Sequence, residues 1–260
     1  MAFFFVFCLL KHLDVEYMSL ALPVCVLVGG IAAITVLSSH GGTTWDAGND
    51  GPISSRDIAR KKCSNPNQGN CLRKEDNLYV ADYPNDADAL LILKRMDAIL
   101  KRLQQQFKKV LLDAGKIDPK NKVAWANTQG LKVTSSKDLD WQLQRIQQFL
   151  QRIPNVTIGE VIKQSKNEFT SYVIDKRDLS LCLRNKSSNE LYADSLVTYV
   201  FLHELGHIMS PTIGHDETFV KCFQIVLRMA VFLHLYVQVD WSRNPIHYCD
   251  GVYLNSTVWA

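Results

Sequence analysis

The stretch LVTYVFLHELGHIMSPTIGHDETFVKCF, residues 196–223, decides which fold the chain is predicted to have. It contains His203, Glu204 and His207 in the order H-E-x-x-H, inside an apolar run long enough for a helix. Residues four apart lie on one face of a helix, one turn from each other. Two imidazoles at this spacing can bind one zinc ion, each at about 2.0–2.1 Å. We therefore predict a helix that carries two zinc ligands.

The acid between the two histidines indicates what such a zinc site would do. Glu204 directly follows the first histidine, so its carboxylate is expected beside the metal rather than on it. There it can take a proton from a zinc-bound water, whose pKa zinc lowers to about 7. We expect Glu204 to be the catalytic general base of a zinc-dependent hydrolase. The alternative, that His203 and His207 are ordinary core histidines, stays open.

Flanking residues predict where this helix begins and ends. Asp194 and Ser195 are residue types that cap a helix start, and Pro211 is expected to end the helix and turn the chain. Gly206, within the motif, either allows a close contact with another helix or has no role.

A catalytic zinc takes three protein ligands and keeps a fourth position open. His215, just beyond the predicted turn, is the expected third ligand. A surface role for His215 is the alternative, with Asp216 and Glu217 as substitute ligands. His234 lies in a second apolar segment, 218–237, and is expected to be a packed or partly exposed helix residue.

A zinc peptidase also needs a place to hold an extended peptide and a donor for the oxyanion. Two short apolar runs, 171–175 and 179–183, predict a β-hairpin. The strand at 179–183 is our candidate to pair with a substrate by main-chain hydrogen bonds, and a central position in the sheet is the alternative. Tyr248, Tyr253 and Arg243 are the candidate oxyanion donors.

Two further helices are predicted ahead of the hairpin. Apolar residues spaced three and four apart over 93–110 predict a helix that Asn85 or Asp86 can cap. We interpret its basic outer face as solvated, with a dimerising coiled coil or a basic binding face as the alternatives. An apolar set over 139–153, stopped by Pro154, predicts the other helix. The expected fold class is α+β, with a small sheet that includes the hairpin.

An apolar segment near the N-terminus predicts a membrane span. No charged residue occurs over the 21 residues 17–37. A helix of that length is about 30 Å long, which is the thickness of a hydrocarbon core. A cleaved signal peptide, a buried soluble helix and a true start at Met18 are the alternatives.

The predicted domain organisation follows from this segment. We expect a short tail at 1–16, a transmembrane helix at 17–39, a linker at 40–76 and a catalytic domain at 77–260. The chain is thus predicted to be a single-pass membrane protein, and its few flanking charges do not assign an orientation.

Composition excludes several classes of protein. A chain of 260 residues that is 47% hydrophobic and 21% charged is not a disordered or low-complexity protein. The net charge of +3 gives no reason to expect nucleic-acid binding. Seven cysteines fall below the density of a disulfide scaffold. Cys63 and Cys71 would form a local disulfide in an oxidising compartment and stay reduced elsewhere.

Three ordered segments carry a resemblance to a known family. They are TSYVIDKRDLSLCLR (170–184), YVFLHELGHIMSPTIGHDETFVKCFQIVL (199–227) and VDWSRNPIHYCDGVYL (239–254). With these segments the chain resembles the WLM-like zinc metallopeptidases of large DNA viruses and some algae and protists. The segment 78–103 is similar to the helical region that precedes them, so the resemblance covers roughly 78–254.

The resemblance implies a zincin-like metallopeptidase domain, with the motif helix, a following helix and a small sheet. It implies that His203, His207 and His215 are the zinc ligands and that Glu204 is the general base. The family ending usually reads Y-C-G, whereas this chain has Asp250 between the cysteine and the glycine. The local turn there departs from the family pattern.

Two functions are therefore weighed. The first is a membrane-anchored zinc metallopeptidase that hydrolyses a peptide or protein substrate, placed in a host or virion membrane if the chain is viral. The second is a non-catalytic, membrane-tethered structural or interaction protein with a structural zinc or none. In the second case the basic helix over 93–110 would be the binding surface.

Overall fold

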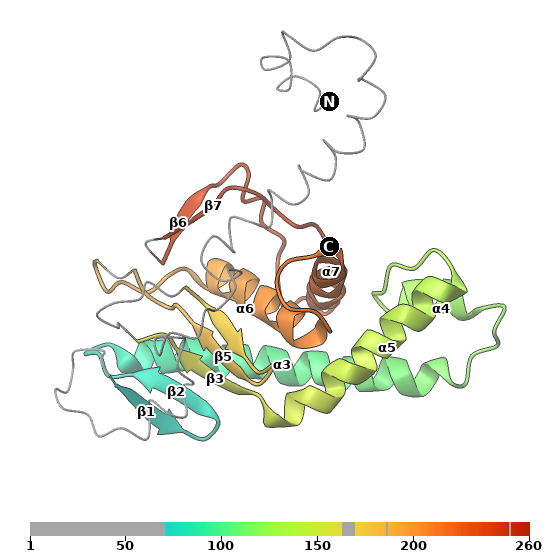
Figure 1. Cartoon of the computed structure of the whole chain (residues 1–260), viewed down its shortest axis with the longest axis horizontal. Coiled ribbons are helices and arrows are strands. Elements are labelled where there is room, and N and C mark those ends of the chain that lie inside the picture. The colour runs from blue at the N-terminus through green and yellow to red at the C-terminus, as the bar shows by residue number, and fades with distance from the viewer. Residues whose placement is uncertain (1–70, 163–169, 186, 250) are drawn as a thin grey trace, which may run out of the picture.

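The computed structural model describes residues 71–162, 170–185, 187–249 and 251–260, which form an α+β fold (Figure 1). In chain order the elements are β1 (Leu72–Glu75), β2 (Leu78–Ala81), α3 (Asp86–Ala114), α4 (Lys122–Thr128), α5 (Ser136–Arg152), the 3-10 turn η2 (Ile153–Asn155), β3 (Thr157–Glu160), β4 (Tyr172–Ile174), β5 (Asp178–Leu181), α6 (Asp194–Met209), α7 (Glu217–Phe232), β6 (Ile246–Tyr248) and β7 (Val252–Leu254).

The main sheet is mixed, with the strand order β1-β2-β3-β5-β4. Its central strand β3 runs parallel to both neighbours and places Ile158 opposite Leu78 of β2 and Leu179 of β5. The outer strands β1 and β4 pair antiparallel to β2 and β5. Strand β1 lies within 40–76, the range predicted as a linker, so the folded part begins earlier than expected.

The predicted hairpin is present as β4 and β5, but its two strands have different positions from those expected. Strand β5 lies between β3 and β4, so it has no free edge, and β4 is the strand at the edge. The candidate for substrate pairing at 179–183 is therefore wrong. A sequence pattern specifies which residues alternate along a strand, whereas the order of strands depends on distant partners.

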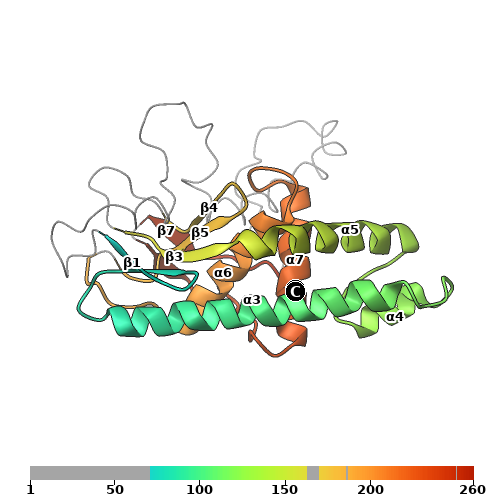
Figure 2. The same ribbon diagram turned by 90° about the horizontal axis from the view of Figure 1, so that it is seen from below.

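The two helices predicted ahead of the hairpin are confirmed. The longest described helix, α3, packs against the sheet and extends past it, with α5 packed on the extended part (Figures 1 and 2). Phe107 of α3 and Phe149 of α5 meet edge to face, with ring centroids 5.7 Å apart. Helix α5 starts just after Ser135, whose side chain accepts a hydrogen bond from the Asp138 amide at 3.2 Å. Asn85 precedes α3 but makes no side-chain cap.

Helix α6 is the core of the molecule, and it is buried on all sides from residue 196 to 206. It starts after Ala193 without a side-chain cap, so the predicted capping by Asp194 or Ser195 is wrong. Instead, Asp194 is paired with Arg95 of α3. A helix that is apolar all round must be enclosed by other elements. Here α3, α5, α7 and the strands β4 and β5 enclose it.

Helices α6 and α7 pack closely because of Gly206. A Cβ added at Gly206 would lie 2.9 Å from the Cβ and 3.0 Å from the Cα of Phe223. Those distances are too short for any larger residue unless the helices move apart. Of the two roles considered for Gly206, the structure shows the close helix contact.

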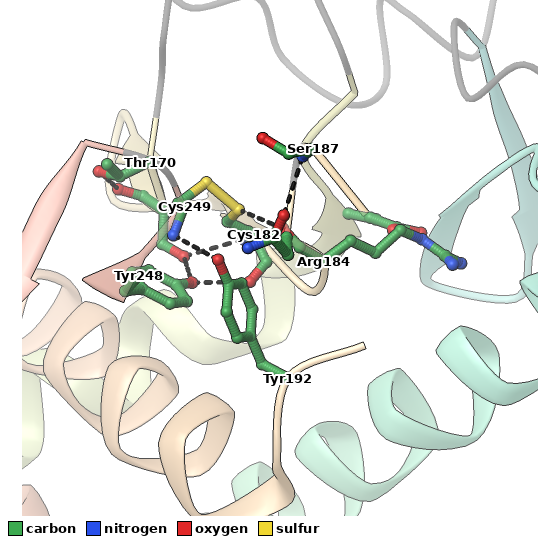
Figure 3. The surroundings of a disulfide bond; sticks show 10 residues. Thr170, Cys182, Arg184, Ser187, Tyr192, Tyr248 and Cys249 are labelled. Atoms are coloured by element: carbon green, nitrogen blue, oxygen red, sulfur yellow. Dashed lines mark hydrogen bonds and ion pairs between the residues drawn. A yellow bond between two sulfur atoms is a disulfide. The ribbon is translucent and has the colours of Figure 1, made fainter. Parts of the chain in front are cut away.

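The C-terminal segment is held to the sheet by a disulfide between Cys182 and Cys249 (Figure 3). Next to it, the Tyr248 hydroxyl donates to the Cys182 carbonyl at 2.8 Å, and the Cys249 amide donates to the Tyr192 hydroxyl at 2.7 Å. The hairpin β6–β7 is thereby fixed over the end of β5. The cysteine pair predicted from the sequence includes Cys63, which lies outside the described residues.

The prediction of a single-pass membrane protein is corrected. Among the described residues, no helix combines the length and the apolar character needed to cross a bilayer. Helix α3 has 29 residues, but charged side chains such as Lys101 and Arg102 cover its outer face. The predicted tail, span and most of the linker, residues 1–70, lie outside the described residues. The fold class of the described residues is α+β.

Candidate metal centre

Three imidazoles converge where α6 ends and α7 begins. The Nε2 atom of His215 lies 3.0 Å from Nε2 of His203 and 3.1 Å from Nε2 of His207. In the part of the chain that the structure describes, these three residues form the one such group that could hold a metal ion, with ligand atoms within 4.8 Å of one another. The structure thus brings the three predicted ligands together.

These distances fit a tetrahedral zinc site. Nitrogens held 2.0–2.1 Å from a zinc ion at the corners of a tetrahedron lie roughly 3.3–3.4 Å apart. Three neutral imidazole nitrogens aimed at one point repel one another unless a cation or a proton lies between them. Three nitrogen ligands also leave the fourth corner open, which is the donor set of a catalytic zinc rather than a structural one.

A short bend after α6 delivers the third imidazole. Helix α6 ends at Met209, and Gly214 adopts a φ of +88°, in the left-handed region that favours glycine. Asp216 then caps α7 by accepting from the Phe219 amide at 2.8 Å, and its carboxylate also accepts from the Thr212 hydroxyl at 3.0 Å. The bend is thus tied to the start of α7, which explains why Asp216 is a cap and not a metal ligand.

Phe219 of α7 packs against all three imidazoles. Its ring stacks on His207 with centroids 4.1 Å apart, and its centroid lies 4.7 Å from His215 and 4.9 Å from His203. Phe223 contacts His203 from the next turn at 5.2 Å. These aromatic contacts restrict how far the imidazole rings can turn. The close approach of α7 at Gly206 is what allows them.

Burial lowers the pKa of all three histidines, so the imidazoles are neutral at physiological pH. Burial takes the pKa of His215 to about 4 and places the pKa values of His203 and His207 well below 6.5, where repulsion from neighbouring histidines adds to the effect. Neutral imidazole is the form that binds a metal ion. Nδ1 of His203 has no hydrogen-bond partner among the described residues, although a ligating imidazole usually donates from its second nitrogen.

Glu204 is buried within the same site. It is 4% exposed, and burial raises the pKa of its carboxyl to about 8. Within the described ranges its carboxylate has no hydrogen bond or ion pair. A dication held by the three imidazoles would favour the ionised form, since a bound cation dominates the local electrostatics. The arrangement is a metal-ligand set beside an unpaired carboxylate that is available for proton transfer.

The other residues considered from the sequence lie elsewhere. Glu217 is exposed and pairs with Lys221 at 2.8 Å. His247 packs on Tyr253 in the β6–β7 hairpin. Helix α7 ends at Phe232, five residues earlier than predicted, and His234 follows it with a φ of +56°.

Of the candidate oxyanion donors, Tyr248 is fully engaged. It lies 2.6 Å from the Ser171 hydroxyl and donates to Cys182, as described above. Its pKa is raised by burial and, to a smaller extent, by the charge of Glu204. Arg243 is highly exposed and pairs with Asp240. Tyr253 is 43% exposed. An oxyanion role for any of the three stays a prediction.

Three contributors to the site were missed from the sequence. Phe219 looked like an ordinary apolar helix residue, and its place four residues after His215 was the available signal. Lys176 and Arg152 bind carbonyls at the end of α6 from the hairpin turn and from α5. Burial, followed by repulsion from Arg152, lowers the pKa of Lys176 to about 8. No local pattern indicated either of these two contacts.

Comparison with known proteins places similar sequences in viruses. A segment of 108 residues is 35% identical to an uncharacterized protein of Acanthamoeba polyphaga mimivirus and covers 41% of this chain and 54% of that protein. Uncharacterized proteins of Invertebrate iridescent viruses 3 and 6 are 34% identical over 61 residues and 32% identical over 68 residues. The alignments cover 24% and 25% of this chain, and 38% of each relative.

The chain thus spans about half the length, or less, of the curated relatives it matches. No family model and no solved structure matches the chain. These relatives carry no described activity that could be compared with the metal centre. What can be inferred about function therefore comes from the geometry of the site.

Proposed function

We propose that this protein is a zinc-dependent metallopeptidase. The observation that carries the proposal is the convergence of three imidazole Nε2 atoms, at 3.0 and 3.1 Å, on one point beside the unpaired, buried Glu204. A purely structural zinc site would be closed by a fourth protein ligand. Among the described residues no fourth histidine, cysteine or acid joins the group.

Each residue of the site has a role in peptide hydrolysis. His203, His207 and His215 would hold zinc, which when bound supplies Lewis acidity and lowers the pKa of water to about 7. Glu204 accepts the proton of the attacking water and then passes it to the leaving amine. A carboxylate with no structural partner can change its protonation state without breaking a contact that holds the fold.

The sheet offers one place for an extended substrate. Of the two edge strands of the main sheet, β1 and β4, it is β4 that packs against α6, the helix with His203 and His207. Main-chain pairing of a peptide with such an edge gives affinity that depends little on the peptide sequence. We assign substrate pairing to β4, in place of the 179–183 strand expected from the sequence.

Zinc content and turnover of the full chain test the proposal. The wild-type protein is expected to hold one zinc per chain and to cleave a quenched fluorescent peptide library, with activity lost to a chelator and restored by zinc. His215→Ala should lose both zinc and turnover. His247→Ala is the matched control, because His247 is exposed and lies outside the group.

Two results would contradict the proposal. If the wild-type chain holds no zinc, the three imidazoles do not form a metal site. If it holds zinc through His215 but cleaves no member of the library, the site is a non-catalytic one.

A further inference from the structure

In the turn between β4 and β5, Lys176 adopts a backbone conformation that residues other than glycine rarely adopt. Asp175 and Lys176 have φ values of +50° and +57°, and the Arg177 amide closes the turn on the Ile174 carbonyl at 2.9 Å. Two successive left-handed residues are typical of a type I′ turn, for which Asn-Gly or Asp-Gly is the preferred pair. Asp175 fits the first position. The second position holds Lys176, although glycine adopts a positive φ with the least steric strain.

The side chain of Lys176 offers a reason for this strain. Its Nζ donates to the carbonyls of His207 and Thr212, each at 2.7 Å. The first of these carbonyls belongs to a metal-ligand residue in the last turn of α6. The second belongs to the bend that leads to His215. A cation at this position also interacts favourably with the negative end of the helix dipole.

A second cationic side chain, from α5, binds carbonyls of the same segment. Arg152, the last residue of α5, donates to the Ser210 carbonyl at 2.9 Å and to the Ile208 carbonyl. Together the two side chains satisfy four carbonyls between residues 207 and 212. Carbonyls at a helix end have no partner within the helix. Without these donors, the conformation of the bend would be held by the hydrogen bonds of the Ser210 and Thr212 hydroxyl groups.

The position of this bend decides where the third ligand lies. Only seven residues separate His207 from His215, and their Nε2 atoms must remain 3.1 Å apart. Thr212 lies near the middle of that segment and is held through its carbonyl by Lys176 and through its hydroxyl by Asp216. If the carbonyl were released, Thr212 would keep its contacts with Asp216 and Ser210 but would lose its connection to the β4–β5 turn.

We propose that Lys176 is a positioning residue for the third zinc ligand. From the β4–β5 turn, its ammonium group holds the bend after α6 in the conformation that brings His215 to His203 and His207. The strained backbone at Lys176 is retained because glycine, the residue that suits the turn, cannot make these two hydrogen bonds. This inference rests on the proposed zinc site and adds to it a connection between the substrate-bearing hairpin and the metal.

Two substitutions of Lys176 separate its side chain from its backbone. Lys176→Met removes the donors and leaves a bulky residue at positive φ, whereas Lys176→Gly removes the donors and relieves the turn. Both are expected to weaken zinc binding of the full chain by about 10- to 100-fold in competition with a chelator, as loss of a supporting partner commonly does. The metal-free thermal midpoint of the glycine variant should equal or exceed that of the methionine variant.

If Lys176 positions the ligand, the zinc affinity of the two variants does not follow their metal-free stability. A merely structural lysine would make the zinc affinity of the two variants follow their thermal midpoints. With cobalt in place of zinc, the visible absorption of both variants should change, because it reports the ligand geometry. Lys176→Arg, which restores the donors, should keep the zinc affinity near that of the wild type. If Lys176→Met does not fold, the comparison of Lys176→Gly with Lys176→Arg still tests the inference.

Arg177→Met is the matched control, since Arg177 follows in the same turn, is exposed and pairs only weakly with Asp175 at 3.7 Å. It should bind zinc as the wild type does. The inference is overturned if the wild type binds zinc through His215 and Lys176→Gly binds it equally well. Absence of zinc from the wild type is a different result, which overturns the proposed function itself and this inference with it.

Discussion

Among the described residues two glutamates are buried, Glu160 in the sheet and Glu204 in the candidate metal centre, and the surroundings of their carboxylates are opposite. Glu160 is 2% exposed and Glu204 is 4% exposed. The carboxylate of Glu160 accepts from Arg184 Nε at 2.6 Å and from the Ala81 amide at 3.0 Å. No described residue pairs with that of Glu204.

Burial of a carboxylate is costly, so each glutamate needs a reason to be there. For Glu160 the reason is structural. Arg184 neutralises its charge and also binds Asn85 at the start of α3, so one ion pair joins the sheet to the longest helix. For Glu204 no such contact exists. Burial raises the pKa of both carboxyls, but Arg184 and the Ala81 amide oppose the rise only at Glu160. The contrast supports the proposed role of Glu204 in proton transfer.

The largest expected effect is on turnover, in Glu204→Gln. The amide cannot accept the proton of the attacking water, and a general base contributes roughly 10²- to 10⁴-fold to the rate. Zinc content should remain at one per chain, and the metal-free thermal midpoint should be unchanged or higher. Peptide cleavage, zinc analysis and thermal unfolding check this, and wild-type turnover in the variant would remove Glu204 from the mechanism.

Glu160→Gln should have the opposite outcome: the free energy of unfolding should fall, whereas zinc binding should be retained. Removing one partner of a buried ion pair costs about 3–5 kcal/mol, because Arg184 would keep an uncompensated buried charge. Denaturant unfolding measures the change, and zinc content of the protein that remains folded should be normal. If this variant is as stable as the wild type, the two glutamates do not differ in the way described.

Gly206→Ala tests whether the surroundings of Glu204 depend on close helix packing. The added methyl group would press on Phe223, and such overpacking costs about 1–3 kcal/mol. Zinc binding should weaken as well, because Phe219 on the same helix packs on the three imidazoles. Gly115→Ala is the control, since its Cβ would meet one atom at 3.7 Å and its φ of −69° suits alanine. Equal stability of both variants would contradict the close contact.

The smallest effect is expected at a third, exposed glutamate. Glu217 pairs with Lys221 four residues later on the surface of α7. Pairs of this kind contribute about 0.3–0.5 kcal/mol. Glu217→Ala should therefore change unfolding only slightly and leave zinc content unchanged. A loss of zinc would show that Glu217 is a ligand, as the alternative drawn from the sequence allowed.

Local patterns predicted the helices well and the long-range arrangement poorly. The spacing over 93–110 predicted α3, and the H-E-x-x-H spacing predicted that α6 presents two imidazoles on one face. Both are properties of a single helix, with a period of 3.6 residues. The cap expected at Asp194 was wrong, since Asp194 pairs with Arg95, which lies 99 residues away in sequence. A local pattern does not contain a partner at that distance.

The sequence by itself determined the segments that become the hairpin and the helices α3, α5, α6 and α7, but not α4, and it named three histidines and one acid as a candidate zinc site. It could do so because those features depend on residues a few positions apart. Only the tertiary structure decided that β4 rather than β5 forms the sheet edge, and that Cys182 pairs with Cys249. It also decided that Lys176 supports the bend to His215. These depend on packing between elements distant in sequence, where many pairings satisfy the same local pattern and the whole core selects one.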